Sequence, residues 1–172
     1  LAVLPLTLLV GCAADTTSDE DLSEGSESEL VQKNLNKSVY TTLQRDKCLS
    51  ELKEGEFGMP WADSYCGGIG GYVVRIVEMD SRDYVSIMKD KNDTDIENVK
   101  ATGGGFSYVG NTAEWRTSGT GTTPFALIFR QHQDVYNETG DIEKTSSLVV
   151  TKLEGEPCII KVIDATKHKD AN

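Results

Sequence analysis

Beyond about Cys48 the chain contains short runs of β-branched and aromatic residues, separated by Gly, Asn, Asp and Ser. Such residues fit a pleated sheet, and short runs of them between turn-forming residues are typical of strands. The gaps between most runs are too short for crossover helices, so we expect a mainly β fold: a single antiparallel β-sandwich or barrel-like domain. The clearest expected strands are residues 72–78, 84–89, 125–131, 148–153 and 159–164.

Other segments carry weaker patterns. Gly110-Asn111, between the expected strand segments 106–109 (FSYV) and 112–116 (TAEWR), predicts a hairpin turn. Val31, Leu35, Val39 and Leu43 recur every four residues, which predicts one short amphipathic helix. Residues 90–105 and 133–147 are polar and are expected to be long loops, and a further helix is expected to begin at residues 167–172.

The charge of the chain excludes one class of partner. The formal net charge is −11, and Lys and Arg form no cluster. Binding of nucleic acid requires clustered cations that neutralise phosphates, so nucleic acid is not an expected partner. A length of 172 residues, 38 % of them hydrophobic, is enough for one folded domain with tails.

The N-terminus is an almost wholly apolar run that ends at Cys12. This run is shorter than the roughly 20 residues that a membrane-spanning helix needs, and it has the length of the apolar region of a signal peptide. The sequence Leu9-Val10-Gly11-Cys12 resembles the lipobox of bacterial lipoproteins. The chain contains no initiator Met or basic segment before this run, so we expect it to begin inside its signal peptide. The alternative is that residues 3–10 form a buried strand or helix.

The lipobox resemblance implies a specific modification. A peptidase would cut between Gly11 and Cys12, the sulfur of Cys12 would carry a diacylglyceryl group, and its new amino group would carry an acyl chain such as palmitate. Two or three acyl chains are enough for stable anchoring in a bilayer. Ala13 stands where Asp signals inner-membrane retention in Gram-negative lipoproteins, so the resemblance favours the outer membrane. A Gram-positive source would instead place the domain outside the cytoplasmic membrane.

The segment after Cys12 is acidic and rich in Ser and Thr. Residues 13–30 contain no Lys or Arg and seven acids: Asp15, Asp19, Glu20, Asp21, Glu24, Glu27 and Glu29. Such a composition cannot bury a core. We therefore expect a partial signal peptide at residues 1–11, a lipidated Cys12 with a flexible tether over residues 12–36, and a β-rich domain over residues 37–172. Residues 31–172 only loosely resemble small exported bacterial proteins of unknown function.

Three cysteines remain for the folded domain: Cys48, Cys66 and Cys158. In an oxidising compartment, one disulfide among them is expected. We favour Cys48–Cys66, because the pair is local and closes a short loop. Cys158 opens an apolar run and is then either a buried free thiol or an alternative partner of Cys66.

Several patterns that suggest chemistry fail on inspection. Residues 66–72 (CGGIGGY) are rich in Gly but lack the third Gly and the helix of a dinucleotide fingerprint, so close packing at a strand entry is favoured. The oxygen-rich set at residues 90–97 does not meet the EF-hand pattern, and a solvated loop is favoured. No zinc-ligand spacing occurs, so no metal or cofactor is predicted.

Catalytic and binding residues are harder to assign. His132 is the plausible internal base, but no nucleophile motif accompanies it, and a surface position is favoured. Carboxylate pairs for glycoside chemistry are available among Glu78, Asp80, Asp83 and Glu114. Glu114-Trp115-Arg116 is a possible binding patch with Arg116 as anchor for an anion. The favoured alternative places Trp115 in the core beneath a surface ion pair.

The functional hypothesis that follows is a membrane-anchored lipoprotein with a periplasmic or surface-exposed β-rich binding or structural module. Its partners would be the bilayer, through acylated Cys12, and a protein or cell-wall component. The alternatives are an envelope hydrolase with catalytic residues in the loops, and an inhibitor of a cell-wall enzyme that uses residues 117–123 (TSGTGTT).

Overall fold

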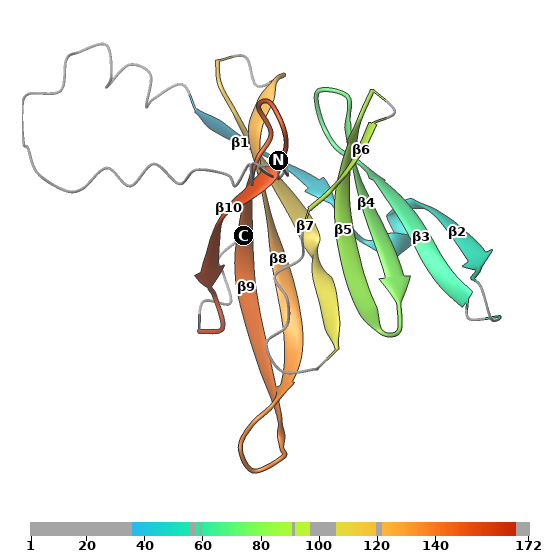
Figure 1. Ribbon diagram of the computed structural model, residues 1–172. Coiled ribbons are helices and arrows are strands. Elements are labelled where there is room, and N and C mark those ends of the chain that lie inside the picture. Colours follow the sequence, from blue (N-terminus) through green and yellow to red (C-terminus); the bar gives the residue numbers. More distant parts are fainter. Residues whose placement is uncertain are drawn as a thin grey trace, which may run out of the picture.

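The computed structural model describes residues 36–55, 58, 60–90, 92–96, 106–119 and 122–167. Over these residues the fold is mainly β, as predicted, with one short 3-10 helix, η1 (Arg45–Lys47) (Figure 1). The strands are β1 (Lys37–Thr42), β2 (Leu49–Glu54), β3 (Pro60–Gly67), β4 (Tyr72–Met79), β5 (Arg82–Lys89), β6 (Asn92–Asp95), β7 (Ser107–Thr117), β8 (Pro124–Tyr136), β9 (Ile142–Lys152) and β10 (Cys158–Asp164).

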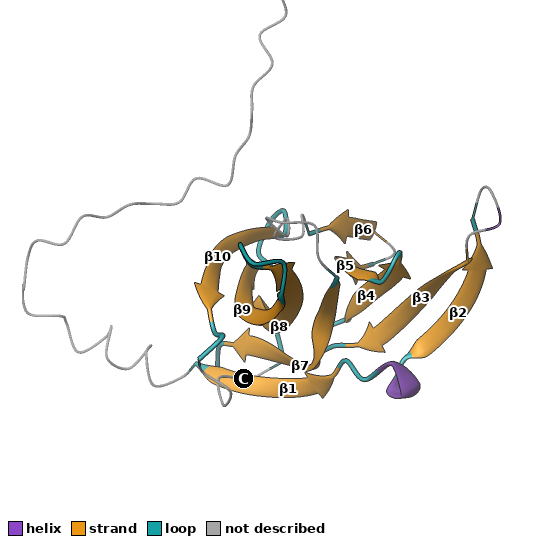
Figure 2. Cartoon of the chain, turned by 90° about the horizontal axis from the view of Figure 1, so that it is seen from below, coloured by secondary structure: helices purple, strands orange, loops and turns teal. Residues whose placement is uncertain are grey.

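All described strands belong to one sheet, in the order β10-β9-β8-β7-β5-β4-β3-β2. In addition, β1 pairs with β7 and β6 pairs with β5. Every neighbouring pair is antiparallel except β5 and β7, which are parallel and share the single pair Arg82↔Ser107. The sheet therefore has two halves, one made of β1 and β7 to β10 and one made of β2 to β6, and they part between β5 and β7 (Figures 1 and 2).

The two halves share one hydrophobic core. Alternate residues of β4 and β5 point inward, including Val74, Ile76, Val85 and Ile87, as expected for strands with one buried face. From the other half come residues of β7, β8 and β9, namely Ala113, Trp115, Leu127, Phe129 and Val149. The runs that the sequence predicted as strands lie within β4, β5, β8, β9 and β10, except for Leu153, which follows the end of β9.

The predicted hairpin at Gly110-Asn111 is wrong. Residues on both sides of this dipeptide pair with the same strand, β8, so β7 continues through it. The register shifts from Val109↔Gln131 to Ala113↔Phe129, which leaves extra residues as a bulge. A Cβ atom at Gly110 would lie 3.2 Å from Cβ of Arg130, so the glycine allows a close approach of β7 to β8.

The predicted helix is also wrong where the structure describes it. Val39 lies in β1, which pairs with β7 along its whole length, and Leu43 is buried just after β1. Pairing with β7 outweighs a weak helical period in a segment that contains Val, Tyr and Thr. Val31 and Leu35, and the helix expected after residue 167, lie outside the described residues.

The two predicted long loops contain strands. β8 continues to Tyr136 and β9 begins at Ile142, so the connection between them is a short turn. In the other predicted loop, β6 pairs with β5 from Ser86↔Asp95 to Lys89↔Asn92. The described parts of both segments are mostly polar because they lie in exposed parts of the sheet, where ladder hydrogen bonds form with few apolar side chains. Residues 97–105 of the first predicted loop lie outside the described residues.

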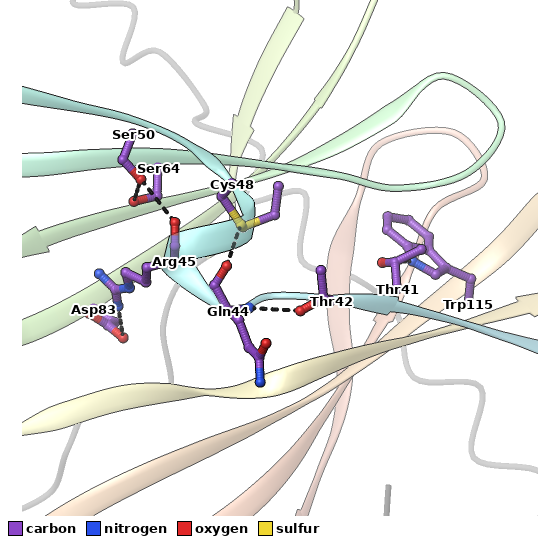
Figure 3. The surroundings of a disulfide bond; sticks show 10 residues. Thr41, Thr42, Gln44, Arg45, Cys48, Ser50, Ser64, Asp83 and Trp115 are labelled. Carbon is purple, nitrogen blue, oxygen red and sulfur yellow. Dashed lines mark hydrogen bonds and ion pairs between the residues drawn. A yellow bond between two sulfur atoms is a disulfide. The ribbon is translucent and has the colours of Figure 1, made fainter.

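The favoured disulfide is present. Cys48, which follows η1, is bonded to Cys66 on β3, with a Cα–Cα distance of 4.6 Å (Figure 3). Because Cys66 is bonded to Cys48, the alternative pair Cys66–Cys158 is excluded. Cys158 is itself disulfide-bonded, so the expectation of a free thiol at this position is wrong.

Candidate functional site

A pocket of about 310 Å³ lies where β5 and β7 part, and we call it the junction pocket. It is a product of the topology: the two strands share one residue pair there, so their side chains line a gap that no ladder closes. The pocket opens among residues of η1, the β4–β5 turn and the start of β7. Its lining residues are Arg45, Glu78, Ser81, Asp83, Phe106, Ser107 and Tyr108.

A buried carboxylate forms the polar wall of the junction pocket. Asp83, near the start of β5, is 2 % exposed. Its Oδ2 accepts a hydrogen bond of 2.7 Å from the backbone N–H of Val109 on β7. If β5 and β7 continued to pair, a backbone carbonyl of β5 would accept this N–H. The carboxylate of Asp83 takes the place of that carbonyl.

Arg45 connects Asp83 to a second carboxylate. Its Nη2 lies 2.5 Å from Oδ2 of Asp83, and its Nη1 donates a hydrogen bond of 2.9 Å to Oε2 of Glu78. The sticks in Figure 3 show Arg45 extending from η1 toward Asp83. A guanidinium held by two carboxylates has a fixed plane, which makes its remaining N–H groups directional donors.

Two aromatic rings form the apolar wall. Phe106 and Tyr108 are 48 % and 43 % exposed, whereas Ser107 between them is buried. This alternation places both rings on the same side of the chain. The ring of Tyr108 stacks on His132 of β8, with centroids 4.7 Å apart and planes at 16°.

His132 is half-buried within β8, whereas the sequence favoured a surface position. Burial, and to a smaller extent the charge of Arg130, lowers the pKa of His132. The nearly parallel stacking of the two rings makes the imidazole a support for Tyr108.

The junction pocket brings together some of the residues that the sequence singled out. Glu78 and Asp83, two of the predicted carboxylates, meet at Arg45. Asp80 instead pairs with Arg82 in the β4–β5 turn, and Glu114 lies on β7 beside β1. Sequence reasoning missed Arg45, Phe106 and Tyr108. The one signal available in the sequence was the alternation of aromatic residues at positions 106 and 108.

The segment Glu114-Trp115-Arg116 has the arrangement that the sequence favoured, with Trp115 in the core and an ion pair on the other face. Trp115 is fully buried, and its Nε1–H donates to Oγ1 of Thr41 at 2.9 Å (Figure 3). On the opposite face, Nη1 of Arg116 lies 3.4 Å from Oε1 of Glu114. The hydroxyl of Ser38 lies between them, accepting from Arg116 and donating to Glu114, each at 2.6 Å.

A second polar cluster lies on the outer face of β2 to β6. The carboxylate of Asp63 is completely buried, and Arg75 donates to both of its oxygens, at 2.8 and 3.0 Å. Lys53 and Tyr65 also donate to Asp63, at 2.8 and 3.0 Å. These hydrogen bonds, that from Arg75 above all, lower the pKa of Asp63 to about 2 against the opposing effect of burial.

The other predicted sites have structural roles where they are described. A Cβ atom at Gly68 would lie 2.4 Å from the Trp115 ring, which confirms close packing in the glycine-rich segment. Asp93 of the oxygen-rich set forms an ion pair with Arg75. Among the described residues, no group of three or more metal-ligating side chains converges. Thr117 is buried at the end of β7, while Gly11 and Cys12 lie outside the described residues.

Comparison of the chain with protein-family models, with curated proteins and with solved structures finds no match. None of the described segments forms a helix with the length and apolar character needed to cross a bilayer. The junction pocket is therefore interpreted from its own residues.

Proposed function

We propose that this protein is a bacterial envelope lipoprotein, anchored through Cys12, whose β-rich domain is a binding module. The observation that carries the proposal is the order of features at the N-terminus: an apolar run, the sequence Leu9-Val10-Gly11-Cys12, and an acidic segment that cannot bury a core. Such an order suits an anchor followed by a spacer. The tether of about 24 residues would reach roughly 27 Å, enough to hold the domain clear of lipid headgroups.

The folded domain supports an oxidising location. Cys48–Cys66 joins the segment after η1 to β3, and Cys158 is also oxidised. Disulfides persist in the periplasm and at cell surfaces and are rare in the cytosol.

Binding is favoured over hydrolysis by the geometry of the junction pocket. Glu78 and Asp83 converge on a single guanidinium, that of Arg45. A glycosidase requires two carboxyl groups that flank a scissile bond from opposite sides. The pocket instead combines fixed polar groups with exposed aromatic rings, which is typical of recognition sites.

The test is the intact mass of the protein recovered from the membrane fraction of cells that produce it. We expect a chain that begins at Cys12 and carries the mass of a diacylglyceryl group and one acyl chain. A Cys12→Ala variant is expected to lack both the lipid mass and the membrane association.

The same experiment contains the outcome that contradicts the proposal. A sulfur in a thioether cannot form a disulfide, so the anchor requires that the disulfide of Cys158 joins it to a cysteine other than Cys12, such as Cys158 of a second copy of the chain. Recovery of a Cys12 peptide disulfide-linked to Cys158, without lipid, contradicts anchoring. Digestion without reductant, followed by mass spectrometry, distinguishes the two states of Cys12.

A further inference from the structure

We propose that the junction pocket is a carbohydrate-binding site that holds one or two sugar rings of a neutral saccharide. This inference deepens the proposed binding function by naming a class of ligand. It does not require the lipid anchor, because every residue involved lies in the folded domain.

The first support is the pair of aromatic rings. Phe106 and Tyr108 are close to half exposed although they line a pocket, and they lie on the same side of the chain. Positions two residues apart in a strand are separated by about 6.6 Å, so the rings form a short platform. The negative face of an aromatic ring attracts the C–H bonds on one face of a pyranose, and such a platform suits a sugar ring.

The platform is preorganised. Tyr108 stacks on His132, and His132 sits on β8, where it is paired with Tyr108 in the sheet register. The backbone beside Phe106 is fixed as well, because its carbonyl accepts the N–H of Asp134 at 2.9 Å. Rings held in place before binding lose little conformational entropy when a ligand arrives.

The second support is the polar wall. The contacts of Arg45 with Glu78 and Asp83 use two of its five N–H donors. Glu78 is about half exposed and contacts Arg45 through Oε2, and the carboxylate has a second oxygen that can accept a hydrogen bond. Donors and acceptors thus stand together beside the rings, as the hydroxyl groups of a sugar require, because each hydroxyl both donates and accepts.

The charged side chains of the pocket favour a neutral ligand over a cation or an anion. A cation entering the pocket would compete with Arg45 for both of its carboxylate partners. An anion drawn to Arg45 would meet the carboxylate of Glu78 at the same point. A ligand without net charge avoids both conflicts, and a pocket of about 310 Å³ is near the lower limit for small-molecule sites, which fits one or two sugar rings.

The experiment is a titration of the ¹⁵N-labelled 172-residue chain with cellotriose, maltotriose and chitotriose, followed by amide chemical shifts. We expect at least one trisaccharide to shift the amides of Ser107 and Val109 in a saturable way. Phe106→Ala and Glu78→Gln are each expected to weaken that binding by about five- to tenfold, with the chemical shifts of the core unchanged. Tyr40→Ala removes an exposed ring on β1, which is paired with Glu114, six residues along β7 from Tyr108, and it is the matched control that should bind normally.

Three results overturn the inference. One is the absence of saturable shifts with all three trisaccharides, and another is an equal loss of affinity in Tyr40→Ala. The third is a response at Ser107 and Val109 to tetramethylammonium or inorganic phosphate, with none to the sugars. The Cys12→Ala variant is expected to keep sugar binding and to lose membrane association. Absence of sugar binding by the lipidated protein contradicts this site alone, and sugar binding by a protein that never carries lipid contradicts the anchor alone.

Discussion

The carboxylate of Asp83 accepts a hydrogen bond of 2.7 Å from the backbone N–H of Val109, although the strands that carry these residues share only one residue pair. One side chain therefore continues the connection between the two halves of the sheet beyond the point where backbone pairing ends. It also holds Arg45 in the junction pocket. Stability and the geometry of the site depend on the same carboxylate.

Asp83→Ala is expected to lower the free energy of unfolding by about 1–3 kcal/mol, because it leaves the N–H of Val109 without its acceptor. Asp83→Asn keeps an acceptor oxygen and should cost less. Urea unfolding of the three proteins measures the difference. Glu78→Gln, a change at a half-exposed carboxylate, is the control and should stay within about 0.5 kcal/mol of the wild type. Equal stability of Asp83→Ala and wild type would contradict this role.

Gly68→Ala should destabilise the protein by about 1–3 kcal/mol. The added methyl group would lie 2.4 Å from Cζ2 of Trp115 and 2.8 Å from the carbonyl oxygen of Tyr72, and neither a buried indole nor a backbone carbonyl can move easily. Gly67→Ala is the matched control, since nothing lies within 4 Å of its Cβ position. Thermal unfolding of both variants checks the prediction, which fails if the two melt at the same temperature.

The sequence predicted strands well where burial on the inner face demands Val, Ile and aromatic residues, as in β4 (YVVRIVEM). It missed β2 (LSELKE) and β6 (NDTD), whose side chains are mostly exposed and whose strands are held by ladder hydrogen bonds and by polar contacts such as those of Lys53 and Asp93. The sequence identified only part of the polar wall of the junction pocket. Glu78 and Asp83 were candidate residues, but Arg45 reaches them from η1, more than thirty residues earlier in the chain. Only the folded sheet brings these three side chains together.

Removal of the Cys48–Cys66 disulfide is expected to lower the free energy of unfolding by about 3 kcal/mol, the value expected for a loop of this length. The double variant Cys48→Ala/Cys66→Ala is preferable to chemical reduction, because a reductant would also break the disulfide of Cys158. Urea unfolding of the oxidised proteins gives the difference. A loss below about 1 kcal/mol would mean that the unfolded chain is already constrained in this region.

The ion cluster around Asp63 predicts a dependence of stability on pH. The folded pKa of Asp63 is about 2 and its unfolded value is close to 3.8, so the folded state binds this proton less tightly than the unfolded state. The cluster's contribution is therefore complete above about pH 4 and is lost as the pH falls through 2, with a total near 2 kcal/mol.

Asp63→Asn removes this titration and keeps the shape of the side chain. The wild type is expected to lose about 2 kcal/mol more than Asp63→Asn between pH 5 and pH 2, because its carboxylate must be protonated while it accepts hydrogen bonds from Arg75, Lys53 and Tyr65. Free energies of unfolding from urea titrations at a series of pH values measure this difference. Parallel pH profiles for the two proteins would show that Asp63 does not titrate at a lowered pKa, and the cluster would then contribute through its shape alone.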